Sequence, residues 1–348
     1  MEYRKCGDSD LMLPVLGVGA WSFGGGDYWG EQDQGSVDRV VNLALDRGCT
    51  LFDSAEMYNE GSSESSLGQA LESRRDEAII ATKVSPHNAR PDDLRRSCEA
   101  SLSRLRTDRI DLYMMHYAIN EMSLRHYTQD PGPADEYPTI EEALATLDAL
   151  RQEGKVRYIG VSNFGVQQLT EALALGVPIV CNQLQYNLIC RMLEFDILPA
   201  CVEHGLGVMT YTPFQQGILT GKYATLDDIP AKRRRTRHFS SRREGTRHGQ
   251  EGAEAETAAA LAAMRLIAAR TGIPMGRLAL SWCLSSPGIT CTLGGARDGT
   301  QLEQNLLAVD APLSPELMEE LNQVTAPLKE KLGSHPDYFE PEGKSRTC

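Results

Sequence analysis

Four polar side chains stand at or just beyond the ends of three short apolar runs in the first third of the chain. Asp53, Lys83 and His116 each close one run, and Tyr58 lies five residues after Asp53. Each residue alone has an ordinary structural explanation, such as a helix cap, a lysine that reaches solvent or a tyrosine with a wet hydroxyl. Together they indicate a site, because a lysine and a histidine that end apolar runs are poor choices for burial without a partner.

The four residue types match the needs of carbonyl reduction. When a hydride arrives at the carbonyl carbon, the nascent alkoxide needs a proton, and the phenol of Tyr58 is a candidate donor if its pKa, about 10 when free, moves toward working pH. A cationic Lys83 beside it would favour phenolate, and Asp53 would keep that lysine protonated. A neutral His116 that donates to the substrate oxygen would orient and polarise the carbonyl.

Eight short apolar runs predict the strands that must hold these side chains. They cover residues 15–21, 50–53, 78–84, 110–116, 158–162, 179–183, 207–212 and 289–294. Amphipathic stretches with helical spacing lie between them. Alternation of strand and helix predicts βαβ units, and eight such units most naturally close into a parallel barrel. The polar strand ends would then meet at its carboxyl rim.

A doubly wound open sheet is the structural competitor, and its usual dinucleotide fingerprint fails here. Gly17 and Gly19 are followed by Ala20, Trp21 and Ser22, where a third glycine should open a helix. The segment therefore reads as two glycines at the edge of a strand.

Two long insertions follow predicted strands, at 117–138 and at about 224–254, so a barrel would carry both on its carboxyl rim, where active sites are built. The second holds a basic cluster at 232–235 with Arg237, Arg242, Arg243 and Arg247. Two readings stay open for this cluster. It is either a solvated, partly disordered loop or a lid that folds over a polyanionic cofactor.

Composition and charge exclude several classes of protein. The 348 residues include 48 acidic and 35 basic ones, and the net charge of −13 disfavours nucleic acid and anionic membrane surfaces as partners. The longest uncharged run, 172–190, contains several amides and a proline, so we expect no membrane span. Nine scattered cysteines without a C-x-x-C pair favour buried thiols in a reducing compartment, with neither a disulfide framework nor a metal site. We expect one cytoplasmic domain over residues 1–348, and a homo-oligomer is compatible with it.

Several segments in order along nearly the whole chain resemble the aldo-keto reductase family. They are 52–64, 81–83, 111–116, 160–164, 182–187, 211–222 and 295–297, with Gln301 and Asn305. The chain is similar to the longer bacterial-type, NADP-dependent members, which are related to the channel β-subunit-like branch. The resemblance implies an α/β fold, a (β/α)₈ TIM barrel with an N-terminal β-hairpin and long loops on the carboxyl rim.

The resemblance also implies the roles of individual residues. Asp53, Tyr58, Lys83 and His116 would form the catalytic tetrad with Tyr58 as proton donor, and Trp21, Tyr58 and His116 would contact the substrate. Nicotinamide would lie against Gly19, Ala20, Trp21, Asp53, Ser162, Asn163, Gln183 and Tyr211. The pyrophosphate would follow Thr212, Pro213, Phe214, Gln215, Gly217, Leu219 and Lys222, and the adenosine end would meet Gly295, Arg297, Gln301 and Asn305.

These residues favour NADPH over NADH as the cofactor. Arg297 offers a planar guanidinium for the 2′-phosphate, and no acidic ribose clamp of the dinucleotide fold is recognisable. The expected activity is reversible hydride transfer to a small carbonyl or alcohol substrate. The alternative is a nicotinamide-binding sensor or regulatory protein with weak or no turnover, and the intact tetrad argues against it.

Overall fold

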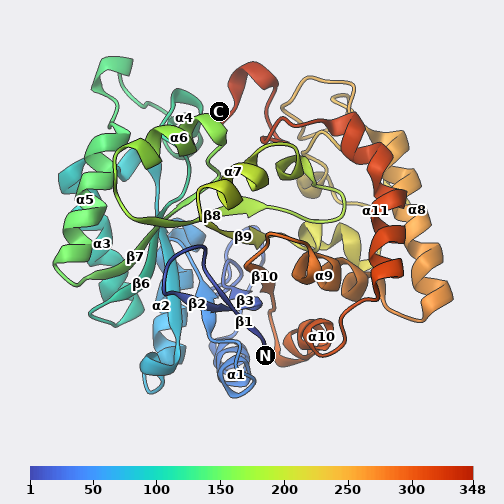
Figure 1. Ribbon diagram of the computed structural model, residues 1–348, viewed down its shortest axis with the longest axis horizontal. Coiled ribbons are helices and arrows are strands. Elements are labelled where there is room, and N and C mark those ends of the chain that lie inside the picture. The colour runs from blue at the N-terminus through green and yellow to red at the C-terminus, as the bar shows by residue number, and fades with distance from the viewer. Residues whose placement is uncertain (348) are drawn as a thin grey trace.

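The computed structural model describes residues 1–347, apart from the side chains at 135 and 342. Eight parallel strands close into a barrel in the order β10, β3, β4, β5, β6, β7, β8, β9, with helices packed around it (Figure 1). The barrel strands are β3 (Leu16–Gly19), β4 (Leu51–Asp53), β5 (Ile79–Val84), β6 (Ile110–Met115), β7 (Val156–Ser162), β8 (Ile179–Gln185), β9 (Gly207–Tyr211) and β10 (Cys291–Gly295). The predicted TIM barrel is therefore confirmed.

Helices follow the strands and cover the outside of the barrel. Their bounds are α1 (Gln34–Asp46), α2 (Ser62–Leu71), α3 (Pro91–Leu105), α4 (Glu121–Tyr127), α5 (Ile140–Gln152), α6 (Val166–Ala174), α7 (Ile197–Glu203), α8 (Glu254–Thr271), α9 (Met275–Ser285), α10 (Gly299–Asp310) and α11 (Pro315–Leu332). In α5, the Thr139 side chain accepts a hydrogen bond from the Glu142 amide and the Glu142 side chain reaches back to the Thr139 amide. Among the described helices, none is long and apolar enough to cross a membrane.

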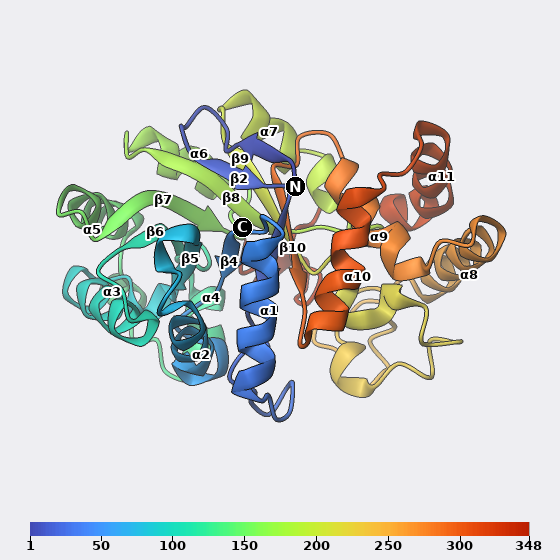
Figure 2. The ribbon, with the colours of Figure 1, turned by 90° about the horizontal axis from the view of Figure 1, so that it is seen from below.

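A small antiparallel hairpin, β1 (Tyr3–Lys5) and β2 (Met12–Pro14), closes one end of the barrel (Figure 2). Leu13 from the hairpin and Cys6 and Leu11 beside it pack against barrel-lining side chains such as Leu112 and Met209. This confirms the predicted N-terminal hairpin. With that end filled by apolar side chains, the opposite carboxyl rim is left for a site.

The two long insertions contain more regular and buried structure than we predicted from the sequence. The first forms the helix α4, whose cap Asn120 accepts from the Ser123 amide. In the second, the backbone and side chains around 236–239 are buried, and Arg237 donates to the carbonyls of Leu332 and His335. The solvated-loop reading is therefore wrong for this part of the insertion, because it fills the space between the barrel rim and the C-terminal segment.

Candidate active site

The predicted strand ends do meet at the carboxyl rim. Parallel pairing sets Asp53 of β4 beside Ala81 of β5, two residues before Lys83. The Lys83 Nζ donates to Asp53 Oδ1 over 2.6 Å and to the Ser54 carbonyl over 2.8 Å, and it lies 3.5 Å from the Tyr58 hydroxyl. Lys83 is 0% exposed. A buried ammonium with a carboxylate partner is thus placed directly behind a phenol.

A tight turn after β4 presents Tyr58 to this lysine. Tyr58 begins the short 3₁₀ helix Tyr58–Gly61, in which Asn59 adopts a left-handed conformation with φ 51°. The Asn59 amide donates to the carbonyls of Trp21 and Phe23, which holds this strained turn in place. The ring of Tyr58 then meets the ring of His116 edge to face, with 5.6 Å between centroids.

Burial sets the protonation states of the site. It raises the pKa of Tyr58 well above its ordinary value, and the charges of Asp53 and Tyr117 act in the same direction. It lowers the pKa of His116 well below its usual range, assisted by the positive charge of Lys83. Burial also lowers the pKa of Lys83, while Asp53 opposes that effect. At neutral pH both Tyr58 and His116 are therefore neutral hydrogen-bond donors.

This result corrects one expectation. The sequence suggested that Lys83 would bring the pKa of Tyr58 down toward working pH. In the structure the removal of the phenol from water outweighs the lysine, whose ammonium is already hydrogen-bonded to Asp53 and Ser54.

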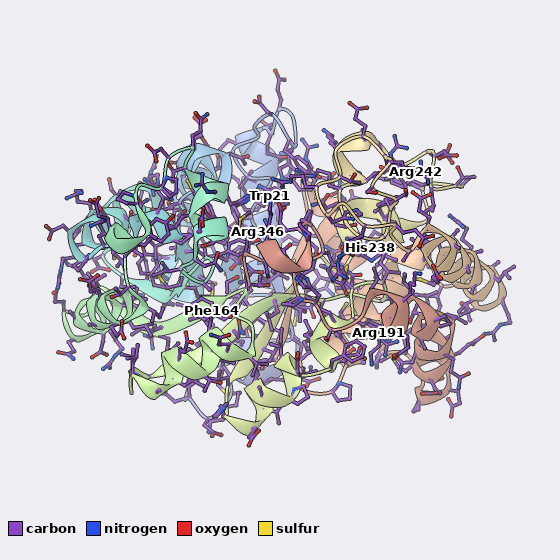
Figure 3. All side chains as sticks on the ribbon, turned by 90° about the horizontal axis from the view of Figure 1, so that it is seen from above. Trp21, Phe164, Arg191, His238, Arg242 and Arg346 are labelled. Atoms are coloured by element: carbon purple, nitrogen blue, oxygen red, sulfur yellow. The ribbon has the colours of Figure 1, made fainter. Side chains whose placement is uncertain are left out.

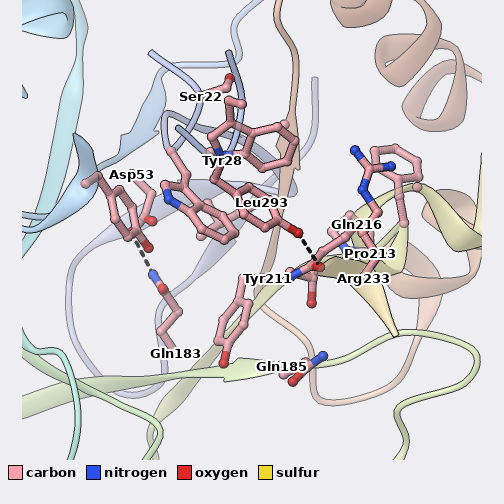
Figure 4. A pocket seen from close by; sticks show the side chains of 18 of the residues that line it. Ser22, Tyr28, Asp53, Gln183, Gln185, Tyr211, Pro213, Gln216, Arg233 and Leu293 are labelled. Atoms are coloured by element: carbon pink, nitrogen blue, oxygen red, sulfur yellow. Dashed lines mark hydrogen bonds between the residues drawn. The ribbon is translucent and has the colours of Figure 1, made fainter. Parts of the chain in front are cut away.

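A chain of hydrogen bonds ties the neighbouring strands to the tetrad. The Gln183 Nε2 donates to Asp53 Oδ2 over 2.7 Å, as Figure 4 shows. The Asn163 Nδ2 donates to the His116 carbonyl, and the Tyr211 hydroxyl donates to Asn163 Oδ1 over 2.6 Å. Polar groups on β8, on β9 and after β7 are thus oriented toward the same space as the tetrad.

That space is a cleft of about 810 Å³, within the size range of small-molecule sites. Most of the site residues predicted from the sequence line it. They are Gly19, Trp21, Asp53, Tyr58, His116, Ser162, Asn163, Gln183, Tyr211, Thr212, Pro213, Phe214, Gly217, Lys222, Gly295, Arg297 and Gln301. Lys83 does not line the cleft, but it contacts Asp53 and Tyr58, which do.

Four residues predicted to bind cofactor do not line the cleft. Ala20 and Leu219 are packed in the core. The Gln215 Oε1 accepts hydrogen bonds from Gln185 and Asn187, and the Asn305 amide donates to the Gly295 carbonyl. These side chains position the backbone of the cleft wall, and a direct contact from them stays a prediction.

Comparison with known proteins identifies the family. The model of the Aldo/keto reductase family matches residues 15–326. An NADH-specific methylglyoxal reductase of Escherichia coli is 30% identical over 90% of this chain and 95% of its own length. A probable voltage-gated potassium channel subunit beta of Arabidopsis thaliana is 29% identical over 93% of this chain and 96% of its own. The chain belongs to the aldo/keto reductase family.

Comparison with solved structures supports the same family assignment. The structure of a glycerol dehydrogenase from Gluconobacter oxydans superimposes with a TM-score of 0.75 at 27% identity, covering 93% of this chain and 95% of that one. This aldo-keto reductase is therefore an oxidoreductase that acts on carbonyl or alcohol groups, and its family uses nicotinamide cofactors.

The cleft of this reductase fits such an anionic cofactor. The 3₁₀ helix Gln215–Thr220 turns at Gly217, whose φ is 91° and where an added Cβ would lie 2.9 Å from the Lys222 Nζ and 3.2 Å from the Arg233 Nη1. A bare backbone turn beside two cations suits a phosphate group. Thr212 also lines the cleft, and its buried hydroxyl has no hydrogen-bond partner among the residues that the structure describes. These groups would hold the cofactor's phosphates and adjoining sugar.

Sequence reasoning assigned no individual role to many other cleft-lining residues of the reductase, although it placed several of them in the two long insertions and in the basic cluster. They include Ser22, Tyr28, Trp29, Met57, Tyr117, His126, Tyr127, Gln185, Gln216, Lys232, Arg233, Arg235, Arg247, Phe339 and Arg346. Most of them come from the loops after β3, β6 and β9, which was a usable signal because these loops rise from the rim, whereas Met57 follows β4 and Gln185 ends β8. Phe339 and Arg346 carried no such signal, since they come from the C-terminal segment after α11.

Proposed function

We propose that this aldo-keto reductase moves a hydride reversibly between NADPH and an aldehyde or ketone, with Tyr58 as the proton donor. The observation that carries the proposal is the neutral Tyr58 phenol, placed 3.5 Å from the Lys83 ammonium and beside the His116 ring in one cleft. When bound, the cofactor supplies the hydride that adds to the carbonyl carbon.

The residues of the chain supply everything else in the reaction. Tyr58 and His116 donate hydrogen bonds to the carbonyl oxygen, which orients and polarises it. Tyr58 then transfers its proton to the nascent alkoxide, and the Lys83 ammonium stabilises the phenolate that is left. Asp53 keeps that ammonium charged. In the oxidation direction the same groups act in reverse, with the phenolate accepting the alcohol proton.

An assay of the wild-type protein tests this function. Purified protein is mixed with NADPH and a panel of neutral aldehydes, and the absorbance of the reduced nicotinamide is followed. We expect steady, enzyme-dependent oxidation of NADPH with at least one aldehyde. Tight NADPH binding without turnover on the whole panel would instead favour a nicotinamide-binding sensor, a role suggested by similarity to a protein named as a channel subunit.

The protonation states predict a flat pH profile for reduction. The raised pKa of Tyr58 preserves the proton donor at high pH, and the lowered pKa of His116 keeps the imidazole neutral at low pH. We expect kcat/KM for a neutral aldehyde to vary by less than about threefold between about pH 6 and about pH 9. Initial rates across this range measure it. A bell-shaped profile centred near neutrality would contradict these assignments.

We further propose that Arg297 selects NADPH over NADH. Its guanidinium donates to the Gln32 side chain and the Glu31 carbonyl, and no carboxylate pairs with it among the described residues. The adjacent Asp298 caps α10 by accepting from the Gln301 amide, so it does not neutralise the arginine. Lys222 and Arg233 at the Gly217 turn would bind the pyrophosphate, and Arg297 would then bind the 2′-phosphate.

Arg297→Ala tests this assignment. Charged hydrogen bonds of this kind are worth about 1.5–3 kcal/mol, so we expect KM for NADPH to rise about ten- to a hundredfold and KM for NADH to change little. Steady-state kinetics with both cofactors measure the difference. Equal losses for the two cofactors, or a wild-type preference for NADH like that of the methylglyoxal reductase relative, would show that Arg297 does not read the phosphate.

We also propose a cytoplasmic location and a small-molecule substrate. The eight cysteines among the described residues are buried and unpaired, which suits a compartment that keeps thiols reduced.

A further inference from the structure

Eight side chains that line the cleft contact one another in a closed circuit. The circuit runs Tyr58, His116, Tyr117, Arg346, Phe339, Arg235, Tyr28, Trp21 and back to Tyr58. The separations between successive groups range from 5.1 Å for Trp21 and Tyr28 to 5.9 Å for Trp21 and Tyr58. Rings that bury apolar area and two guanidinium groups therefore surround the space in front of the proposed proton donor.

The two cations of the circuit stand away from the catalytic pair. Phe339 lies midway round the circuit from Tyr58 in either direction, and an arginine flanks it on each side. Arg346 lies 5.2 Å from both the Phe339 and the Tyr117 ring centroids, and Arg235 lies 5.8 Å from the Phe339 ring and 5.9 Å from the Tyr28 ring. Figure 3 labels Trp21 and Arg346 on this side of the molecule.

Arg346 is fixed by a partner of its own. Its Nε and Nη2 each donate over 2.7 Å to the two oxygens of Asp337, and both residues are buried. Arg247, another cation that lines the cleft, lies 3.4 Å from a carboxylate oxygen of Glu340. The charges of these two arginines are thus largely balanced within the C-terminal segment.

Arg235 has no such partner. Among the described residues, no hydrogen bond or ion pair holds its guanidinium, and its Nε is buried without a protein acceptor. Its contacts are the faces of Tyr28 and Phe339, which position a guanidinium without neutralising it. An acceptor on a bound ligand would satisfy this donor, for which the described residues provide none.

The charges of the residues that line the cleft also indicate an anionic ligand. The cations that line it are Lys222, Lys232, Arg233, Arg235, Arg247, Arg297 and Arg346, whereas the only carboxylate of the described lining is Asp53. Asp53 is already occupied by Lys83. This excess of positive charge stands in a protein whose net charge is −13. The cations at the Gly217 turn and Arg297 would bind the anionic groups of the cofactor. Arg235, in the aromatic circuit, is then a cation without an assigned anion.

We propose that the preferred substrate of this reductase is an aldehyde or ketone that carries an oxyanion, a carboxylate or a phosphate, and that Arg235 binds it. The proposal rests on the carbonyl reduction proposed above. The carbonyl meets Tyr58 and His116, the rings of the circuit contact the carbon skeleton, and the anionic group reaches the guanidinium across the cleft. Arg346, whose charge is balanced by Asp337, is held in position as part of the wall beside it.

Matched pairs of aldehydes test the proposal with the intact enzyme and NADPH. The carboxylate arm compares 4-carboxybenzaldehyde with 4-methylbenzaldehyde, and the phosphate arm compares glyceraldehyde 3-phosphate with glyceraldehyde. We expect kcat/KM of the wild-type enzyme to favour the anionic member of at least one pair by about ten- to a hundredfold. The pair with the larger ratio identifies the oxyanion. Turnover of neutral aldehydes with no preference in either pair overturns the proposal while leaving the reductase function intact.

Two variants of the same insertion then locate the effect. In Arg235→Met the stem is kept and the charge is lost, so the preference for the anionic member should fall about tenfold, mainly through KM. Arg242→Met is the control, because Arg242 is exposed and does not line the cleft, and its preference should match the wild type. If Arg235→Met instead raises KM for NADPH and keeps the aldehyde preference, the arginine binds the cofactor and the proposal is wrong.

A binding measurement tests whether Arg235 binds an anion even if the enzyme shows no turnover. Calorimetric titration of the NADPH complex with benzoate and with benzamide compares an anion with a neutral ligand of the same shape. Benzoate should bind about tenfold more tightly or better, and Arg235→Met should remove that difference. Equal affinities in the wild-type complex overturn the proposal. If benzoate binds more tightly but no aldehyde is reduced, only the proposed reductase function is wrong.

Discussion

Tyr58→Phe is expected to lower kcat for aldehyde reduction by about 10²–10⁴-fold, the usual contribution of general acid catalysis. The variant removes only the hydroxyl that we propose as the proton donor to the nascent alkoxide. The rest of the site stays in place, because the Lys83 ammonium keeps its hydrogen bonds to Asp53 and Ser54. The affinity for NADPH should therefore change little. Single-turnover rates and fluorescence titration with NADPH measure the two quantities separately.

A second tyrosine provides the matched control. Tyr127 also lines the cleft and lies 5.8 Å from the His116 ring centroid. Lys83 lies over the ring of Tyr58, 5.0 Å from its centroid, and among the described residues no lysine takes that position at Tyr127. Tyr127→Phe should lower kcat by less than about tenfold. Near wild-type turnover of Tyr58→Phe on every aldehyde tested, or equal losses in the two variants, would falsify the assignment of Tyr58 as proton donor.

Breaking the ion pair between Asp53 and Lys83 should have the largest effect on stability. Both side chains are buried, with 4% and 0% of their side-chain surface exposed, so removal of one partner leaves an uncompensated charge in the core. We expect Asp53→Asn and Lys83→Met each to lower the free energy of unfolding by about 3–5 kcal/mol. Both should also reduce kcat, because the phenolate formed at Tyr58 loses its nearby cation. Urea unfolding and initial rates measure the two effects.

The double variant Asp53→Asn/Lys83→Met separates stability from catalysis. With no buried charge left unpaired, part of the lost stability should return, whereas activity should stay low because the lysine is gone. The exposed pair of Arg47 and Asp310, joined at 3.1 Å, is the control, and Arg47→Met should cost less than about 1 kcal/mol. Recovery of activity in the double variant would show that the pair acts only by holding the fold.

The barrel and its tetrad could be predicted because their signals are local. Buried parallel strands are apolar on both faces, so each appears as a short continuous run, and the polar residue that ends a run marks the rim. Asp53, Lys83 and His116 all carry this mark. The resemblance to a family added predicted roles for residues such as Ser162 and Tyr211, which have no distinctive local pattern.

The second insertion shows where local signals fail. Its basic and glycine-rich composition reads as a solvated loop, yet Arg237, His238 and Phe239 are buried. Their partners are Leu332, His335 and Tyr338, which lie almost a hundred residues later in the chain. The composition of a segment indicates how it would behave in water. It gives no information on the surfaces against which the segment packs in the folded protein.

The sequence by itself determined the fold class and the reaction class, and it predicted candidate catalytic residues at the strand ends, because these depend on residue types and on spacing along the chain. Only the tertiary structure decided which charges are left without a partner. Arg346 and Arg235 look alike in the sequence, but Asp337 neutralises the first and aromatic rings hold the second. Tertiary structure also decided that the pKa of Tyr58 is raised rather than lowered, since burial depends on every element packed around the phenol.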